Sequence, residues 1–142
     1  MITVAARAAH AGLDPEKGIS AILELSHVVQ ALFALNDPER GITVNVGTID
    51  GGMRPNVVAP QSSAEVDVRV PTQTDAEEIE RAIHGIKPTV PGTCLEITGR
   101  IGRPPLERTP RNRKLWQRAL AAAQSLGIEI EEGAAGGGSD GN

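Results

Sequence analysis

Apolar and polar residues alternate with a period of two in four separate stretches of the chain. The alternation is clearest where Glu65, Asp67 and Arg69 occupy every second position between small or branched apolar side chains. A period of two puts one set of side chains on each face of a strand, so these stretches are predicted strands with one buried face. They cover residues 3–10, 42–49, 64–70 and 94–101.

Two other stretches repeat apolar residues at the spacing of an amphipathic helix. The first is predicted to begin with Asp14 as N-cap and Pro15 in the first turn. Its apolar stripe is formed by Ile22, Leu25, Val29 and Leu32. The second begins at the sequence "TDAE", where Thr74 is the predicted N-cap and Glu77 completes a capping box. It is expected to end near Gly85.

The predicted elements therefore follow the order strand, helix, strand, strand, helix, strand. A sheet whose strands are apolar on one face only is normally antiparallel. With two amphipathic helices, this order predicts an α+β fold of the ferredoxin-like β-α-β-β-α-β type. Such a fold has a four-stranded antiparallel sheet with both helices on one face. We expect this domain to span residues 1–106.

Residues 107–142 do not belong to that plan. Thr109-Pro110 predicts the start of a third helix, which Gly127 closes. The alternating sequence "IEIEE" at residues 128–132 predicts one more strand. A helix and a strand with nothing to pack against are interpreted as a fragment of a second domain.

A composition poor in aromatic residues narrows the range of partners. Phe33 and Trp116 are the only aromatic side chains among 142 residues, so no stacking platform for single-stranded nucleic acid is predicted. The formal net charge of −4 also argues against binding to a phosphate backbone. No run of about 18 apolar residues occurs, so no membrane-spanning helix is predicted. The single Cys94 excludes an internal disulfide and is expected to be a small core residue.

The glycine-rich end of the chain raises two further possibilities. Gly136, Gly138 and Gly141 fit the pattern G-x-G-x-x-G of dinucleotide-binding loops. That pattern requires a following helix and an acidic residue about 20 positions further on, and the sequence supplies neither. Ser139 beside Asp140 lacks the G-x-S-x-G elbow of a serine hydrolase. Neither a dinucleotide site nor a catalytic serine is therefore predicted.

The histidines do not have the spacing of metal ligands. A two-metal hydrolase needs several convergent His and carboxylate ligands. His10, His27 and His84 form no H-x-x-x-H or H-x-D pair, and the 18 acidic residues are spread along the chain. No metal site is predicted in this chain.

Three polar residues lie where a side chain has room to act. His10 ends the first predicted strand among small residues, Asn56 lies in a turn-rich loop, and Arg69 projects from the predicted uncovered face of the sheet. Each also has an ordinary explanation: a solvated strand end, an amide that stabilises its own loop, and an ion pair with Asp67. Their combination is more informative than any one of them.

Three longer stretches give these residues a common context. They are "ARAAHAGLDPEKGISA", "TVNVGTIDGGMRPNVVAPQSSAEVDVRVP" and "GGGSDGN". Their sequence, order and spacing closely resemble the M20 metallopeptidases, especially the glutamate carboxypeptidase-like branch. The resemblance covers nearly the whole chain.

The resemblance implies a two-domain enzyme. A catalytic domain holds two zinc ions and a general-base Glu, and a smaller lid domain, also called the dimerisation domain, has the fold predicted above. Such enzymes hydrolyse an amide bond next to a free carboxylate, in small peptides or N-acyl amino acids. The lid forms a homodimer through its edge strand and first helix.

The resemblance also implies roles for individual residues. His10 reaches into the active site of the partner subunit and helps to stabilise the tetrahedral oxyanion. Asn56 and Arg69 bind the substrate, with Arg69 taking the carboxylate. Gly138 lies against the substrate carbonyl or carboxylate, and Asp140 braces the glycine-rich turn.

The sequence departs from the family pattern at both ends. The zinc-binding stretch expected upstream, with its general-base Glu, is absent, and so is the last metal-ligand His expected downstream. The resemblance therefore implies a lid followed by a fragment of the catalytic domain (residues 107–142), which binds no cofactor and is inactive alone. The alternative is a stand-alone ferredoxin-like dimerisation or regulatory module, and native sequence upstream of Met1 would decide between them.

The predicted topology also separates the candidate residues. The first two strands run together and the third runs back, so His10 and Asn56 are expected at one end of the sheet and Arg69 toward the other. This placement predicts that His10 and Asn56 serve the partner's active site, whereas Arg69 serves its own.

Overall fold

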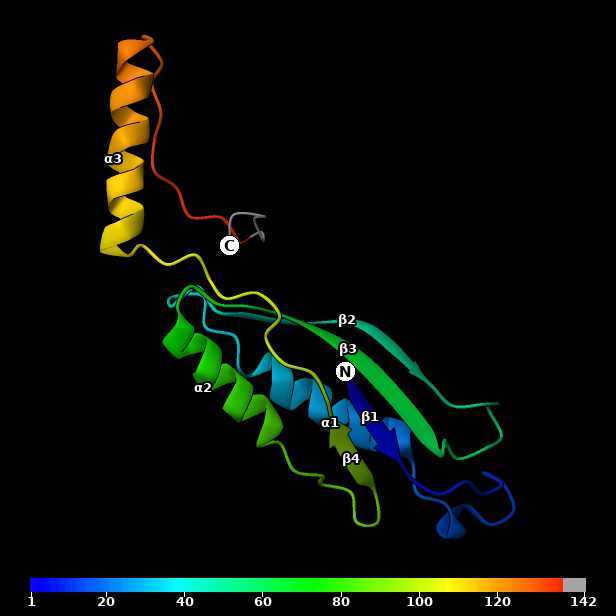
Figure 1. Ribbon diagram of the computed structural model, residues 1–142. Coiled ribbons are helices and arrows are strands. Elements are labelled where there is room, and N and C mark those ends of the chain that lie inside the picture. Colours follow the sequence, from blue (N-terminus) through cyan, green and yellow to red (C-terminus); the bar gives the residue numbers. More distant parts are fainter. Residues whose placement is uncertain (137–142) are drawn as a thin grey trace.

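The computed structural model describes residues 1–136, and the chain folds there into one sheet with helices on one side (Figure 1). In chain order the elements are β1 (Ile2–Ala5), a 3₁₀ helix (Pro15–Lys17), α1 (Ala21–Phe33), β2 (Thr43–Gly51), β3 (Gln61–Arg69), α2 (Gln73–His84), β4 (Cys94–Ile97) and α3 (Pro110–Ser125). Within residues 1–136, no helix combines the length and the apolar character needed to cross a membrane.

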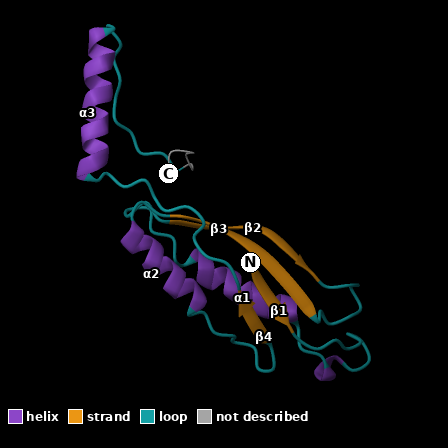
Figure 2. Ribbon diagram, in the orientation of Figure 1, coloured by secondary structure: helices purple, strands orange, loops and turns teal. Residues whose placement is uncertain are grey.

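The four strands are arranged in the order β2-β3-β1-β4, and every neighbouring pair is antiparallel. β1 and β2 therefore run in the same direction, and β3 runs opposite to both. Helices α1 and α2 lie on one side of the sheet (Figure 2), and no helix of residues 1–136 covers the other face. The predicted ferredoxin-like α+β fold is confirmed.

The hydrophobic core lies between this sheet and its two helices. Every second residue of the strands points into it, which is why the alternation in the sequence located the strands. Its most deeply buried members are Ile2, Val4, Ala21, Leu25, Val28, Leu32, Ile42, Val44, Ala64 and Ile79.

A charged side chain is also buried in the core. Glu24, on α1, is fully buried, and its carboxylate accepts hydrogen bonds from the N–H groups of Thr89 (3.0 Å) and Val90 (2.6 Å). Burial by itself raises the pKa of this carboxyl, but the donors from Val90 and Thr89 outweigh it and hold the pKa below its ordinary value. Glu24 thus anchors the loop between α2 and β4 to α1. No pattern in the sequence indicates this role.

The first helix begins later than predicted. Asp14-Pro15 opens only the short 3₁₀ helix, whereas α1 begins after Ser20, whose hydroxyl accepts the N–H of Leu23 (3.2 Å). The reason is a tertiary contact, because Ile19 exchanges backbone hydrogen bonds with Arg7 and so is held extended.

The face of α1 that contacts the core overlaps the predicted stripe, because Val29 also packs against the core. Val28 is buried, whereas Ile22, which the sequence placed in the stripe, is 47% exposed. Leu25 and Leu32 are buried as predicted.

Three other local predictions are corrected. The N-cap of α2 is Thr72 rather than Thr74, and its hydroxyl accepts the N–H of Asp75 (3.1 Å). β1 ends at Ala5 rather than at residue 10, so His10 lies in a turn and not in a strand. Cys94 is exposed, because the alternate positions of β4 face the core.

Helix α3 stands apart from the sheet (Figure 1). Its ends are as predicted: the Thr109 hydroxyl accepts the N–H of Asn112 (3.2 Å), and Gly127 follows with a φ of 71°. The predicted strand at residues 128–132 is wrong, because no neighbouring strand supplies backbone partners for it in the described part of the chain.

Candidate functional site

His10 lies in a tight, exposed turn at the end of β1. Its backbone N–H donates to Asp14 Oδ1 (3.2 Å), and its carbonyl accepts the N–H groups of Leu13 (3.3 Å) and Asp14 (3.1 Å). Its ring nitrogen Nδ1 accepts the backbone N–H of Gly12 (3.1 Å). The imidazole is thus held over the turn.

The structure brings Asn56 next to this turn. The carbonyl of Asn56 accepts the N–H of Ala11 (2.9 Å), and His10 forms an isolated antiparallel bridge with Val57. The backbone, not the amide side chain, joins the two segments. His10 and Asn56 therefore share one end of the sheet, as the sequence predicts, although neither belongs to a strand.

Arg69 lies at the opposite end of the sheet. It is the last residue of β3, and its Nε donates to Asp67 Oδ2 (2.8 Å) on the uncovered face. Its Nη1 donates to the carbonyl of Gly136, which belongs to the glycine-rich stretch far along the chain. Among the described residues, no hydrogen bond of Nη2 is found.

The two ends of the sheet are far apart. β3 runs from Gln61, which pairs with Ala5 of β1, to Arg69, which pairs with Thr43 of β2. A strand rises about 3.3 Å per residue, so its two ends are separated by about 26 Å. His10 and Arg69 of one chain are therefore too far apart to contact one small molecule together.

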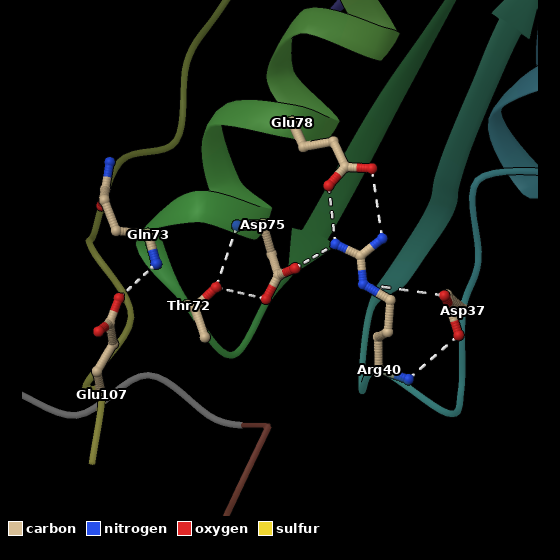
Figure 3. Close-up of polar contacts among 7 residues, drawn as sticks. All are labelled: Asp37, Arg40, Thr72, Gln73, Asp75, Glu78 and Glu107. Atoms are coloured by element: carbon tan, nitrogen blue, oxygen red, sulfur yellow. Dashed lines mark hydrogen bonds and ion pairs between the residues drawn. The ribbon is translucent and has the colours of Figure 1, made fainter. Parts of the chain in front are cut away.

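A cluster of charged residues lies beyond Arg69, where α2 begins (Figure 3). The guanidinium of Arg40 contacts Asp75 Oδ1 (2.5 Å) and Glu78 Oε2 (2.8 Å), and its backbone N–H donates to Asp37 Oδ1 (3.1 Å). The hydrogen bonds from Thr72 and Arg40 lower the pKa of Asp75, and those from Arg40 lower the pKa of Glu78. The cluster fastens the turn before β2 to the first turns of α2.

The chain after β4 is attached to the same end of the domain. Glu107 Oε1 accepts the backbone N–H of Gln73 (2.6 Å) at the start of α2 (Figure 3). The adjacent Arg108 contacts both carboxylate oxygens of Glu132, at 2.5 and 2.7 Å. Neighbouring residues therefore connect the chain to α2 on one side and to the stretch after α3 on the other.

The described residues do not supply a metal site. Within residues 1–136, no group of three His, Cys, Asp or Glu side chains converges to hold an ion. The donors among these residues thus do not fit zinc coordination. Gly138 and Asp140 lie outside the described residues.

Fold and site together define an α+β domain that carries exposed polar residues at both ends of its sheet. Residues 1–88 match the family model M20_dimer, described as the peptidase dimerisation domain. The chain therefore belongs to the M20 peptidase dimerisation domain family.

Two of the proteins to which the chain is similar are named as carboxypeptidases. Carboxypeptidase G2 from Pseudomonas sp. (strain RS-16) is 24% identical over 138 residues, which cover 93% of this chain and 33% of that protein. A probable carboxypeptidase from Paracoccidioides brasiliensis is 33% identical over 123 residues, which cover 75% of this chain and 28% of that protein. The chain thus spans about a third of the length of these relatives.

The fold recurs in solved structures. A tripeptidase from Staphylococcus aureus subsp. aureus Mu50 superimposes with a TM-score of 0.71 at 22% identity, over 99% of this chain and 38% of that one. At this identity the likeness shows the fold. It also shows that the shared part includes the segment with α3.

Two contacts of the candidate site were not predicted from the sequence. Gly12 could have been noticed, because a glycine two residues after a histidine can bring its N–H under the ring. The contact of Arg69 with Gly136 joins residues 67 positions apart. No local signal announces such a contact.

Proposed function

We propose that the chain is the lid and dimerisation part of a two-zinc M20 metallopeptidase or amidohydrolase, which cleaves an amide bond next to a free carboxylate. The metal ligands and the general base belong to a catalytic domain, of which residues 107–142 form a part. The family membership and the carboxypeptidases among the relatives support this proposal.

In this proposal His10 is an oxyanion donor. A tetrahedral intermediate needs hydrogen-bond donors where its negative charge develops, and removing one such donor typically lowers kcat about 10²–10³-fold. His10 is exposed at a fixed turn, and Asn56 lies beside it, so both can approach a substrate held by another molecule.

Arg69 binds the substrate carboxylate. A guanidinium matches a carboxylate with two parallel N–H···O bonds, which an ammonium cannot do. Asp67 occupies Nε and the carbonyl of Gly136 occupies one hydrogen of Nη1. We assign the edge formed by Nη1 and Nη2 to the ligand. Gly138, two residues beyond Gly136, is placed by the family resemblance against the same substrate.

The observation that carries the proposal is the length of β3. Because about 26 Å separates its two ends, each active site takes His10 and Asn56 from one subunit and Arg69 from the other. Arg69 serves the site of its own subunit, since it contacts Gly136 of the same chain.

Such sharing requires a homodimer. β2 is an edge strand, and the exposed apolar residues Ile49 on β2 and Ile22 on α1 lie on the elements proposed for the contact. Between the start of α1 and the loop of Met53 and Val57 lies an open groove of about 560 Å³. If the chain forms this homodimer, light scattering of the chain in solution should give the mass of two subunits.

Mixed dimers of the full-length protein test the sharing. One subunit carries His10→Ala, and the other has its metal ligands removed. His10→Ala homodimers should be almost inactive, whereas the mixed dimer should regain activity in one of its two sites. The matched Arg69→Ala subunit should give no rescue with the same partner, because Arg69 acts in its own site.

Opposite results identify different errors. Rescue of Arg69→Ala together with failure of His10→Ala would reverse the assignment of the two ends. Full activity of both homodimers would contradict the proposed site altogether. It would favour a regulatory module without catalysis.

A further inference from the structure

The ring of His10 has an unusually direct backbone partner. Nδ1 lies 3.1 Å from the backbone nitrogen of Gly12, and the N–H points at the ring nitrogen. A backbone N–H can only donate, so Nδ1 must be the acceptor. The two residues are two positions apart in the sequence, and both belong to one turn.

That geometry determines where the ring proton lies. A neutral imidazole carries one N–H donor and one bare nitrogen. If the proton were on Nδ1, two N–H groups would face each other. We therefore propose that Gly12 is a positioning residue that holds neutral His10 in the Nε2–H tautomer.

The turn is constrained well enough for this contact to persist. His10 donates its own N–H to Asp14 Oδ1, and Asp14 returns its N–H to the carbonyl of His10. Ala11, between His10 and Gly12, is tied to the carbonyl of Asn56. The residues on both sides of the ring contact therefore have their own backbone partners.

The catalytic importance of this tautomer rests on the proposed function. An oxyanion is stabilised by a donor that is already in place when charge develops. With Nδ1 occupied by Gly12, the single donor of the neutral ring is Nε2–H, at the far side of the ring from the turn. The turn thus presents a neutral donor outward, with no tautomer change needed at the moment of reaction.

The other two histidines provide internal references. His27 lies on α1 and His84 is the last residue of α2. Within residues 1–136, no hydrogen bond reaches either ring. Their neutral rings should exchange between tautomers as freely as in solution.

Nitrogen NMR of the ¹⁵N-labelled 142-residue chain tests the inference directly. At a pH where all three rings are neutral, long-range ¹H–¹⁵N spectra should show His10 with a fully bare Nδ1 and a protonated Nε2. His27 and His84 should show averaged shifts. A scalar coupling across the hydrogen bond should also join Gly12 N to His10 Nδ1.

Two variants of Gly12 form a matched pair. Gly12→Ala keeps the N–H, and its added Cβ would lie 3.6 Å from His10 Cε1, an ordinary contact, so the His10 pattern should be unchanged. Gly12→Pro removes the N–H, so the His10 shifts should move to the averaged values of the reference histidines. If that variant misfolds, the coupling in the unmodified chain still decides.

An Nδ1–H ring, or His10 shifts as averaged as those of His27, overturns the inference. The spectra do not depend on activity, so they separate it from the proposed function. A fixed tautomer combined with full activity of His10→Ala enzyme would contradict the function alone.

Discussion

The sheet with α1 and α2 and the segment of residues 107–136 are held in different ways. The first shares one apolar core between sheet and helices. The second is attached by polar contacts of Glu107 with Gln73 and of Gly136 with Arg69, and α3 buries only Ala123. Salt screens exposed ion pairs, but it does not screen the packing of apolar side chains.

Two helices show what this difference means for the sequence. α1 has 13 residues and α3 has 16, and both have a hydroxyl N-cap. Isolated helices of about this length are marginal in water, and most of their stability in proteins comes from packing. α1 obtains that packing from the sheet, whereas α3 relies on its caps and its own hydrogen bonds.

A matched pair of leucine truncations should show the largest contrast. Leu32 on α1 is 0% exposed, and Leu115 on α3 is 66% exposed. Leu32→Ala should lower the free energy of unfolding by about 2–5 kcal/mol, because it leaves a cavity. Leu115→Ala should change it by less than about 0.5 kcal/mol. Urea unfolding followed by far-UV circular dichroism measures both, and similar losses would remove the distinction between the regions.

The buried Glu24 should give the next largest effect. Glu24→Gln keeps the shape but replaces one acceptor oxygen by an NH₂ group that faces the N–H groups of Thr89 and Val90. Leaving such donors unsatisfied should lower the free energy of unfolding by about 1–3 kcal/mol at pH 7. Glu39→Gln, at an exposed position, is the control and should have little effect.

The same two variants test how the stabilisation contributed by Glu24 depends on pH. The pKa of Glu24 is lowered in the folded state, so the unfolded chain takes up the proton first as the pH falls. Its stabilisation is complete above the ordinary value of 4.5 and is lost as the pH falls through the folded pKa. Asp75, Glu78 and Glu132 shift in the same direction. The difference between the unmodified chain and Glu24→Gln therefore isolates Glu24, and a constant difference from pH 7 to about 3 would contradict its role.

The smallest effect on stability is expected at the connection between the regions. The chain has one tryptophan, Trp116 on α3, and one cysteine, the exposed Cys94 on β4. Energy transfer from Trp116 to a dye on Cys94 therefore reports how α3 is held relative to the sheet. Glu107→Ala should broaden the donor–acceptor distance distribution without changing the urea midpoint, because it frees the N–H of Gln73.

High salt should broaden the same distribution in the unmodified chain. The exposed Arg108–Glu132 pair joins the stretches before and after α3, and salt screens it. Glu131→Ala, one residue before Glu132, serves as the control and should leave the distribution unchanged. An unchanged distribution in Glu107→Ala would show that other contacts hold α3.

Local patterns predicted some features correctly and missed others for identifiable reasons. Alternation located β3, because successive side chains of a strand point to opposite faces of the sheet and only one of these faces is buried. Thr109 and Gly127 located the ends of α3, because both caps act within one turn. Asp14-Pro15 was misleading, because the pairing of Ile19 with Arg7 overrides its helix signal.

The candidate site shows the same division. The motif around His10, Asn56 and Arg69 could be found from the sequence, and their separation followed from the topology. The contacts that fix their positions could not, since Ala11 meets Asn56 and Arg69 meets Gly136 only after folding.

The sequence by itself determined the order of the elements in the sheet domain and its fold, because alternation, helical spacing and capping act over a few residues. The family followed from the resemblance of three longer stretches. Only the tertiary structure decided that Glu24 is buried with a charge, that residues 128–132 form no strand and that Gly12 meets the His10 ring. A strand needs a neighbour and a buried carboxylate needs donors. Whether either is present depends on where the rest of the chain lies.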